Sequence, residues 1–389
     1  MRAERGFSLI ELAIAVALTT AVVASVSAML HPAHGAFETT LEVADMQQRL
    51  RVTADTLARD LTAAGAGAYA AGRLGPLVRY FAPVLPFRQG AAADDPAGTF
   101  RTDTITLITV PTTAAQTTLT ADLLPGVLTV QAAAAPGCPA GTNLCGFVAG
   151  MTIAIYDDTG NVDAFTVASV TDATAQLTLK ARPADSASTT YVRGSNVVEA
   201  RVDVYYLKAD ATLQSFQLMH SDGSANADVP AVDHVVGLAF EYFGEPRPPL
   251  LLAPGNTSYG PAPPPVATRT TAYPAGENCA FRIDAASGEQ VPRLDVLDTA
   301  AALTALTRDQ LVDGPWCPDD ANANRWDADL LRIRKVGVTI RVEAALAALR
   351  GPAGVLFANG GSSRAPNRWA PDQLIRFEVS PRNLNLERE

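Results

Sequence analysis

The chain has 389 residues, of which 48% are hydrophobic and 18% charged, and its formal net charge is −10 at pH 7. This length is sufficient for a sizeable hydrophobic core and for more than one subdomain. The acidic excess argues against an extended nucleic-acid interface, which needs a positive surface, so no direct nucleic-acid binding is predicted, although a local basic groove is not excluded.

The first predicted element is an apolar segment over residues 7–30, which follows a short basic stretch containing Arg2 and Arg5. About 20 apolar residues cross the hydrocarbon core of a bilayer, so this segment is long enough to span a membrane. Glu11 is its only charged residue. A charge inside a membrane helix costs about 2.5 kcal/mol or more, and Glu11 therefore predicts a specific partner.

The second predicted element is an amphipathic helix over residues 31–64, whose regular pattern begins at Phe37 and which Gly65 would end. Pro32 lacks a backbone donor and should bend or interrupt the rod, which would otherwise be about 85 Å long. A coiled-coil interaction helix is the alternative. The expected apolar positions are Leu41, Met46, Leu50, Leu57 and Leu61. The charges expected on the other faces are Glu38, Glu42, Asp45, Arg49, Arg51, Asp55, Arg59 and Asp60.

The N-terminal run Arg5-Gly6-Phe7-Ser8-Leu9-Ile10-Glu11 resembles the start of type IV prepilins and of type II secretion pseudopilins. The resemblance implies that residues 1–6 are a leader, that prepilin peptidase cuts between Gly6 and Phe7, and that the new Phe7 amine is N-methylated. It also implies that Glu11 pairs with the N-terminus of a neighbouring subunit, since a buried carboxylate and ammonium offset each other's desolvation. An ordinary secretory signal cut after Ala28 and a simple membrane anchor are the alternatives.

The remainder, residues 65–389, predicts a mainly β head, because several segments alternate apolar and polar side chains as half-buried antiparallel strands do. These segments are residues 104–110, 127–131, 151–156, 164–170, 176–180, 197–207, 213–219, 235–243, 330–342 and 374–379. The predicted fold class is α+β: a long N-terminal helix, transmembrane in its first half, packed on a mainly antiparallel β head with loop-rich insertions.

One insertion is predicted at about residues 245–329. Residues 246–265 are rich in proline, which excludes a regular helix or a central strand and favours an extended surface loop. A short helix is expected over residues 299–311, with Asp298 as its N-cap. The stretch from residue 65 to residue 98 is a second loop-rich connection.

The four cysteines predict two disulfides if the head lies outside the cytoplasm. Cys138 and Cys145 bracket a short loop and would pair, and Cys279 with Cys317 would close the insertion. Three connectivities are possible, and free buried thiols are the alternative. Zinc is not predicted, because the chain has no Cys-x-x-Cys pair and no neighbouring histidines.

An oxygen-rich loop over residues 319–329 is a weak calcium candidate. Asp320, Asn322 and Asn324 have calcium-ligand side chains at alternate positions, but the turn glycine and the bidentate glutamate of an EF-hand are missing. A solvated acidic turn is the alternative interpretation. No other metal site and no cofactor is predicted.

Catalytic signals are weak, and the chain is predicted not to be an enzyme, with no catalytic residues assigned. His220, Ser221 and Asp222 adjoin in sequence, but a triad requires geometry, not adjacency. The chain also lacks a Gly-x-Ser-x-Gly elbow, a phosphate-binding glycine loop and a His-Glu-x-x-His motif.

Several head segments are similar to those of PilW-type minor pilins: residues 205–207 with Leu213, residues 235–242, residues 331–340 and residues 380–384. Major pilins usually have a proline where this chain has Ala28. The resemblance implies a minor pilin of a bacterial type IV pilus that primes or caps the filament. Its partners would be other minor and major pilins, prepilin peptidase and the assembly platform in the inner membrane.

The same resemblance implies a single-pass protein of the inner membrane, with its head in the periplasm and later in a pilus or at the cell surface. A J-type pseudopilin of a type II secretion system is one alternative function. A membrane-anchored extracytoplasmic adhesin, which would retain residues 1–6, is the other.

Overall fold

The computed structural model describes residues 8–67, 76–87, 103–113, 115–157, 161–180, 189–210, 215–221, 229–245, 281–292, 303–311, 328–350 and 370–386. The chain divides into two compact units, Met1–Arg51 with Val342–Gln373 and Val52–Arg341 with Leu374–Glu389. An apolar N-terminal helix is followed by mostly antiparallel sheets, which confirms the α+β fold class. The boundaries predicted for leader, membrane segment and head stay predictions.

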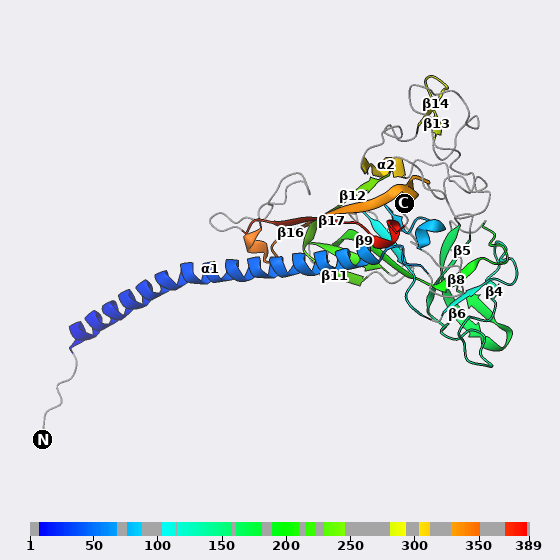
Figure 1. The fold of residues 1–389 in the computed structure, drawn as a ribbon. Coiled ribbons are helices and arrows are strands. Elements are labelled where there is room, and N and C mark those ends of the chain that lie inside the picture. Colours follow the sequence, from blue (N-terminus) through cyan, green and yellow to red (C-terminus); the bar gives the residue numbers. More distant parts are fainter. Residues whose placement is uncertain are drawn as a thin grey trace. The chain divides into compact units, whose positions relative to one another are not determined.

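The N-terminal helix α1 runs without a break over Leu9–Ala63 and appears as one continuous coil in Figure 1. Its 55 residues correspond to a length of about 80 Å. The predicted interruption at Pro32 is therefore wrong, whereas the alternative, a bend at Pro32, stays a prediction. Proline removes one backbone hydrogen bond, and the long helical stretches on both sides outweigh that single loss in a cooperative helix.

The amphipathic pattern of α1 is partly confirmed. Met46, Leu57 and Leu61 are fully buried, and Leu50 is nearly so. The two exceptions are Leu41, which is 55% exposed, and Asp60, which is 2% exposed. Asp60 was expected on a charged outer face, and it is buried because polar partners from a distant strand contact it, as described below.

The end of α1 is set by Gly65, as predicted. Gly65 has a φ of +80°, a left-handed conformation that glycine adopts without steric cost. A Cβ at this position would lie 3.0 Å from Cδ1 of Leu384 and 3.1 Å from Cγ of Pro83. Asn383 Nδ2 donates to the carbonyls of Ala63 and Ala64, each at 3.3 Å, which satisfies groups that the helix leaves unpaired.

In the smaller unit, polar contacts join α1 to the segment that follows residue 342. The Glu42 carboxylate accepts a hydrogen bond from the Ala345 backbone amide. Arg350 pairs with Glu343 at 3.3 Å and donates to the carbonyls of Ala344 and Ala345. In sequence, Glu343, Ala344 and Ala345 precede the 3-10 helix η7 (Ala347–Leu349), and Arg350 follows it.

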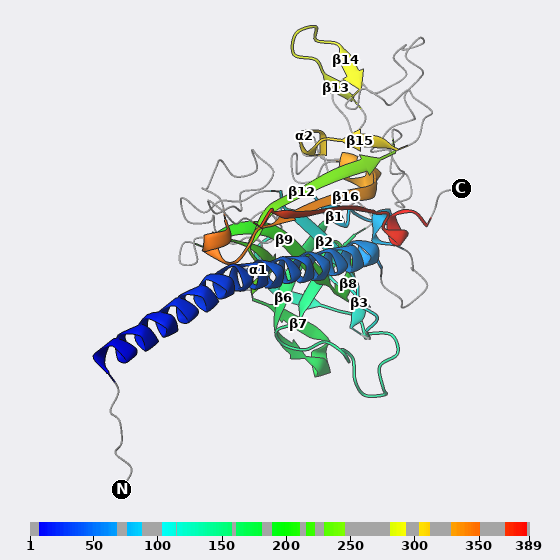
Figure 2. The ribbon, with the colours of Figure 1, turned by 90° about the vertical axis from the view of Figure 1, so that its left-hand side faces the viewer.

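Two sheets of the larger unit form its framework (Figures 1 and 2). The five-stranded sheet has the order β1 (Val84–Leu85), β2 (Ile105–Thr109), β9 (Arg201–Asp210), β10 (Ser215–Ser221) and β11 (Val229–Asp233). The four-stranded sheet has the order β15 (Thr304–Leu306), β12 (Val235–Gly244), β16 (Ile333–Val342) and β17 (Gln373–Val379). All described pairings in the five-stranded sheet are antiparallel.

A six-stranded sheet lies between β2 and β9 in sequence. Its order is β3 (Gln116–Thr118), β8 (Asn196–Glu199), β5 (Thr152–Tyr156), β6 (Val162–Thr171), β7 (Gln176–Leu179) and β4 (Thr129–Gln131). The remaining strands, β13 (Phe281–Ile283) and β14 (Gln290–Pro292), form a hairpin. The other 3-10 helices are η1 (Leu77–Arg79), η2 (Asp172–Thr174), η6 (Ala328–Arg332) and η8 (Arg382–Leu384).

Strands lie at or within all the predicted segments, with one split: the segment over residues 197–207 is divided at Ala200 into β8 and β9. The predicted helix over residues 299–311 is confirmed only at its end, and residues 299–302 lie outside the described residues. Thr304–Leu306 is β15, which pairs with β12, and α2 covers only Arg308–Leu311. A capping box starts α2 late, because Thr307 N donates to Gln310 Oε1 at 2.9 Å and Gln310 N donates to Thr307 Oγ1 at 3.2 Å.

Candidate assembly site

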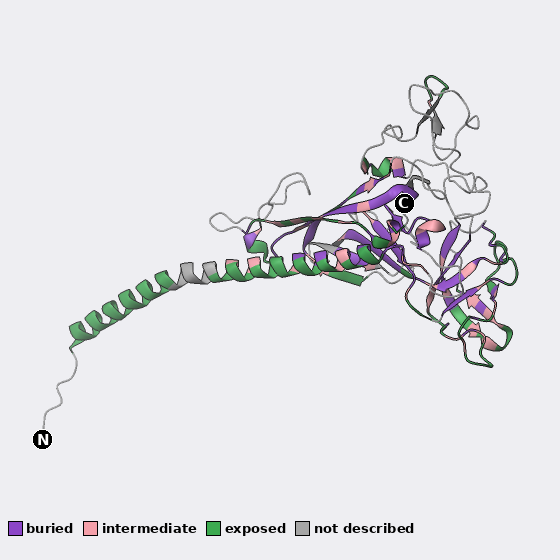
Figure 3. Cartoon of the chain, viewed as in Figure 1, coloured by how far each residue is buried: buried purple, intermediate pink, exposed green. Residues whose placement is uncertain are grey.

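The first part of α1 is a candidate membrane span over Leu9–Met29, with a mean hydropathy of 2.2. Its large apolar side chains are exposed, and Figure 3 accordingly colours these turns green. The hydroxyls of Thr19 and Thr20 each donate to a carbonyl one turn earlier at 2.7 Å, and Ser25 does so at 2.8 Å. Polar groups satisfied within the helix suit a lipid environment, where water cannot satisfy them.

Ser8 and Glu11 form a capping box at the start of α1. Ser8 N donates to Glu11 Oε2 at 2.9 Å, and Glu11 N donates to Ser8 Oγ at 3.2 Å. The reciprocal pair satisfies two of the backbone donors that a helix N-terminus leaves unpaired. A carboxylate in the first turn also interacts favourably with the helix dipole. Glu11 therefore has a local partner within its own chain, which the sequence interpretation missed although the Ser-x-x-Glu spacing signals it.

The capping box gives Glu11 a fixed place at the end of an exposed apolar helix. Its carboxylate lies three residues after Ser8, next to the point where the predicted mature chain begins. The arrangement can present a negative charge to a positive group arriving at the same level of the membrane. Gly6 and Phe7, the predicted cleavage and methylation residues, lie outside the described residues.

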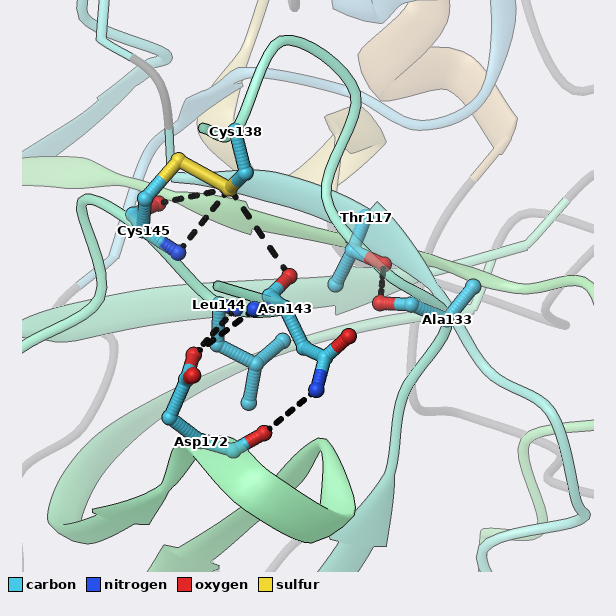
Figure 4. The surroundings of a disulfide bond; sticks show 7 residues. All are labelled: Thr117, Ala133, Cys138, Asn143, Leu144, Cys145 and Asp172. Atoms are coloured by element: carbon cyan, nitrogen blue, oxygen red, sulfur yellow. Dashed lines mark hydrogen bonds between the residues drawn. A yellow bond between two sulfur atoms is a disulfide. The ribbon is translucent and has the colours of Figure 1, made fainter. Parts of the chain in front are cut away.

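The loop between Cys138 and Cys145 is closed by a disulfide, with Cα atoms 5.5 Å apart (Figure 4). Cys145 N donates to Cys138 Sγ at 3.0 Å. The other predicted pair, Cys279 with Cys317, lies outside the described residues. The calcium candidates Asp320, Asn322 and Asn324 also lie outside them. Among the residues that the structure describes, no group of three or more histidine, cysteine or acidic side chains could hold a metal ion.

A buried polar cluster joins the last turns of α1 to the five-stranded sheet. Tyr205 Oη donates to Asp60 Oδ2 at 2.5 Å, and Arg201 Nη2 donates to Asp60 Oδ1 at 2.9 Å. The same guanidinium contacts Asp203 Oδ2 through Nε at 2.8 Å. His220 Nε2 lies 2.7 Å from Asp203 Oδ1. The cluster thus places one arginine between two buried carboxylates.

Local electrostatics keep the Tyr205 hydroxyl protonated and the Arg201 guanidinium charged. Burial, followed by the hydrogen bond to Asp60, raises the pKa of Tyr205 above its usual value. Burial acts to lower the pKa of Arg201, but Asp203 and Asp60 together outweigh it, so that this pKa is raised. Tyr205 therefore remains a neutral donor and Arg201 a cation over the whole physiological range, which keeps both carboxylates of the cluster bonded.

Within the described part of the chain, the carboxylate that His220 contacts is that of Asp203. His220 lies opposite Tyr205 in the β9–β10 pairing, with ring centroids 4.9 Å apart. Asp222 lies outside the described residues. Sequence reasoning missed the cluster, because its members are far apart in the chain. The spacing of Arg201, Asp203 and Tyr205 along one strand face was the available signal.

Residues 1–27 match the family model of the prokaryotic N-terminal methylation motif. No curated protein and no solved structure matches the chain. The motif supports a type IV pilin-like or pseudopilin protein that is processed by prepilin peptidase and assembles with other pilins. It points to a structural role, and together with the apolar helix it fits a protein anchored in the inner membrane.

Proposed function

We propose that this chain is a minor pilin of a bacterial type IV pilus, of the PilW type, which joins other minor pilins to prime or cap the filament. The observation that carries the proposal is an exposed apolar helix of membrane length whose only charge is Glu11, within a stretch that matches the N-terminal methylation motif. In this proposal residues 1–6 are the leader and residues 7–30 the membrane segment.

In the proposed mechanism, cleavage after Gly6 gives Phe7 a free amine, which prepilin peptidase methylates. While the chain is alone in the membrane, the capping box with Ser8 holds the Glu11 carboxylate. During assembly, the ammonium group of a neighbouring subunit pairs with that carboxylate. The pairing removes an uncompensated charge from the membrane, and apolar contacts between the helices add to it.

A minor role fits the size of the head, because more than 300 residues follow α1. A head of this size with additional sheets suits a subunit at the filament tip better than one repeated along the shaft. At the tip, neighbouring subunits surround the head on fewer sides, so a large head has more room. Ala28, where major pilins usually have a proline, supports the same choice. The head would lie in the periplasm before assembly and at the pilus tip or cell surface afterwards.

The J-type pseudopilin is the second candidate, since the methylation motif is shared by both groups of proteins. The two are separated by which machine takes up the chain. Deletion of the gene should abolish piliation if the chain is a minor pilin, and should abolish secretion of folded proteins through the outer membrane if it is a pseudopilin. Restoring the wild-type chain should reverse either defect.

The experiment that tests the proposal compares Glu11→Ala and Glu11→Gln with the matched control Glu38→Gln, whose side chain is also exposed on α1. Both Glu11 variants should be cleaved normally but should be absent from sheared filaments. The Glu38 variant should be incorporated as the wild type is. Normal piliation with either Glu11 variant would contradict the proposed mechanism.

A further inference from the structure

Residues 110–200 leave the five-stranded sheet and return to it at one place. β2 ends at Thr109 and β9 begins at Arg201, and these two residues are paired with each other. The six strands between them pair only with one another among the described strands. We call residues 110–200 the inserted module, and its strands β4, β5, β6 and β8 are grouped in Figure 1.

The inserted module has a hydrophobic core of its own. Every residue of one buried apolar cluster lies between Ala115 and Val197, and the cluster includes Phe165 and Tyr191. Tyr156 joins the module to the framework, because its ring contacts those of Tyr80 and Phe81 at centroid distances of 5.1 Å and 5.4 Å. A segment with its own core and adjacent ends has the properties of a separate cooperative unit.

The disulfide loop supplies part of that core. Leu144, inside the loop, and Phe147, just after it, are 2% and 5% exposed and belong to the cluster. The loop is fixed by Asp172 of η2, whose Oδ1 accepts hydrogen bonds from Asn143 N at 2.9 Å and Leu144 N at 2.7 Å (Figure 4). Asn143 Nδ2 also donates to the Asp172 carbonyl at 2.7 Å. Leu144 is therefore held in place by the closed loop and by Asp172 together.

The backbone of the loop gains much freedom when the disulfide is absent. Gly137, just before the loop, Gly141, within it, and Gly146, just after it, have left-handed φ values between +85° and +88°. Glycines gain more conformational entropy on opening than other residues do. No helix or strand lies between the two cysteines. In the loop-entropy model, a disulfide closing so short a loop shifts the opening equilibrium by about 50-fold.

We propose that the Cys138–Cys145 disulfide is a redox-sensitive latch on the inserted module. A dithiol reductant transfers two electrons and two protons to the disulfide, giving two thiols on the protein and a disulfide in the reductant. The loop then detaches from Asp172, and Leu144 and Phe147 leave the core, while the two framework sheets stay folded. Only the biological setting depends on the proposed function: the latch would close after the head leaves the reducing cytoplasm.

The test is hydrogen exchange, read by mass spectrometry, on the full chain in detergent with and without dithiothreitol. Reduction should speed exchange about 50-fold for amides near Asn143, Leu144 and Asp172, while β9, β10 and β12 change less than about twofold. Cys138→Ser/Cys145→Ser should show the fast exchange without reductant. Cys279→Ser/Cys317→Ser is the matched control and should keep the response to dithiothreitol.

A further variant and two contradicting outcomes complete the test. Asp172→Ala retains the disulfide and the backbone carbonyl that accepts from Asn143 Nδ2, but it loses the two carboxylate contacts to the loop. Exchange should therefore rise in the module alone and by less than reduction causes. Unchanged exchange in the module after verified reduction would overturn the latch, and so would an equal rise in β9 and β10. Neither result bears on cleavage after Gly6 or on filament incorporation, so the latch and the proposed function can fail separately.

Discussion

The phenol of Tyr205 donates a hydrogen bond of 2.5 Å to the carboxylate of Asp60, across 145 residues of sequence. Asp60 lies in the last turns of α1 and Tyr205 in β9, the central strand of the five-stranded sheet. Arg201, at the start of the same strand, binds the second oxygen of that carboxylate. This buried contact therefore connects the end of α1 to the sheet within the larger unit.

Replacing Asp60 by alanine should lower the free energy of unfolding by about 2–4 kcal/mol. The substitution leaves the buried Tyr205 hydroxyl without its acceptor, which is costly, and removes one of the two carboxylates that Arg201 contacts, since Asp203 remains. Arg201 is half exposed, so its share is reduced by solvent screening. Urea unfolding of the detergent-solubilised chain measures the change. The matched control is Asp55→Ala on the exposed face of the same helix, which should change stability by less than about 0.5 kcal/mol.

Stability should fall steeply once the pH rises above about 10, the pKa of an unperturbed tyrosine. Burial, then the Asp60 bond, raises the pKa of Tyr205, and burial does the same for Tyr242. The unfolded chain then loses protons that the folded chain retains, so the stabilisation present below pH 10 is lost as the pH increases. Tyr205→Phe should make the fall shallower when unfolding is followed between pH 8 and pH 11. An unchanged slope would show that Tyr205 titrates normally in the fold.

Gly65→Ala should destabilise the larger unit more than Gly126→Ala does. Both glycines have left-handed φ values, +80° and +78°, so each substitution carries a similar backbone cost of about 1 kcal/mol. Only at Gly65 would the new Cβ also crowd Leu384 and Pro83, whereas nothing lies within 4 Å of it at Gly126. The added cost of overpacking is about 1–3 kcal/mol. Thermal unfolding of the two variants under one set of conditions compares them, and equal losses would be inconsistent with the crowding at Gly65.

Ser8→Ala should leave filament incorporation close to that of the wild type, in contrast to Glu11→Gln. The alanine variant loses the Ser8 hydroxyl but retains the backbone amide that donates to Glu11. The cost is that of a lost helix cap, about 1 kcal/mol. Quantifying the protein in sheared filaments measures both variants. If Ser8→Ala abolished incorporation as completely as Glu11→Gln, capping of α1 would account for the role of Glu11 without a neighbouring amine.

Local signals in the sequence were sufficient for the main elements of the fold. Alternation of apolar and polar side chains located strands such as β5 and β17, and Gly65 marked the end of α1. The break at Ala200 was not predictable, because apolar residues continue on both sides of it. The break exists because β8 pairs with strands of the inserted module, whereas β9 pairs with β2. These partner strands lie far from Ala200 in the sequence.

The candidate assembly site and the buried polar cluster were predictable only where the signal lies within a single segment of the sequence. Glu11 is distinctive within its own apolar surroundings, so a single segment was enough to find it. Asp60 resembles the other charges of the amphipathic helix, and its burial depends on Arg201 and Tyr205, far along the chain. The disulfide loop was found from spacing alone, but its attachment to Asp172 depends on how β6 and β7 are joined.

The proposed assembly mechanism requires a free amine on Phe7, because Glu11 can pair with a neighbouring subunit only if the leader has been removed. Mass spectrometry of the N-terminal peptide from the exported protein tests this requirement most directly. The account predicts a peptide that begins with N-methylated Phe7. A peptide that still begins with Met1, or one that begins after Ala28, would contradict it.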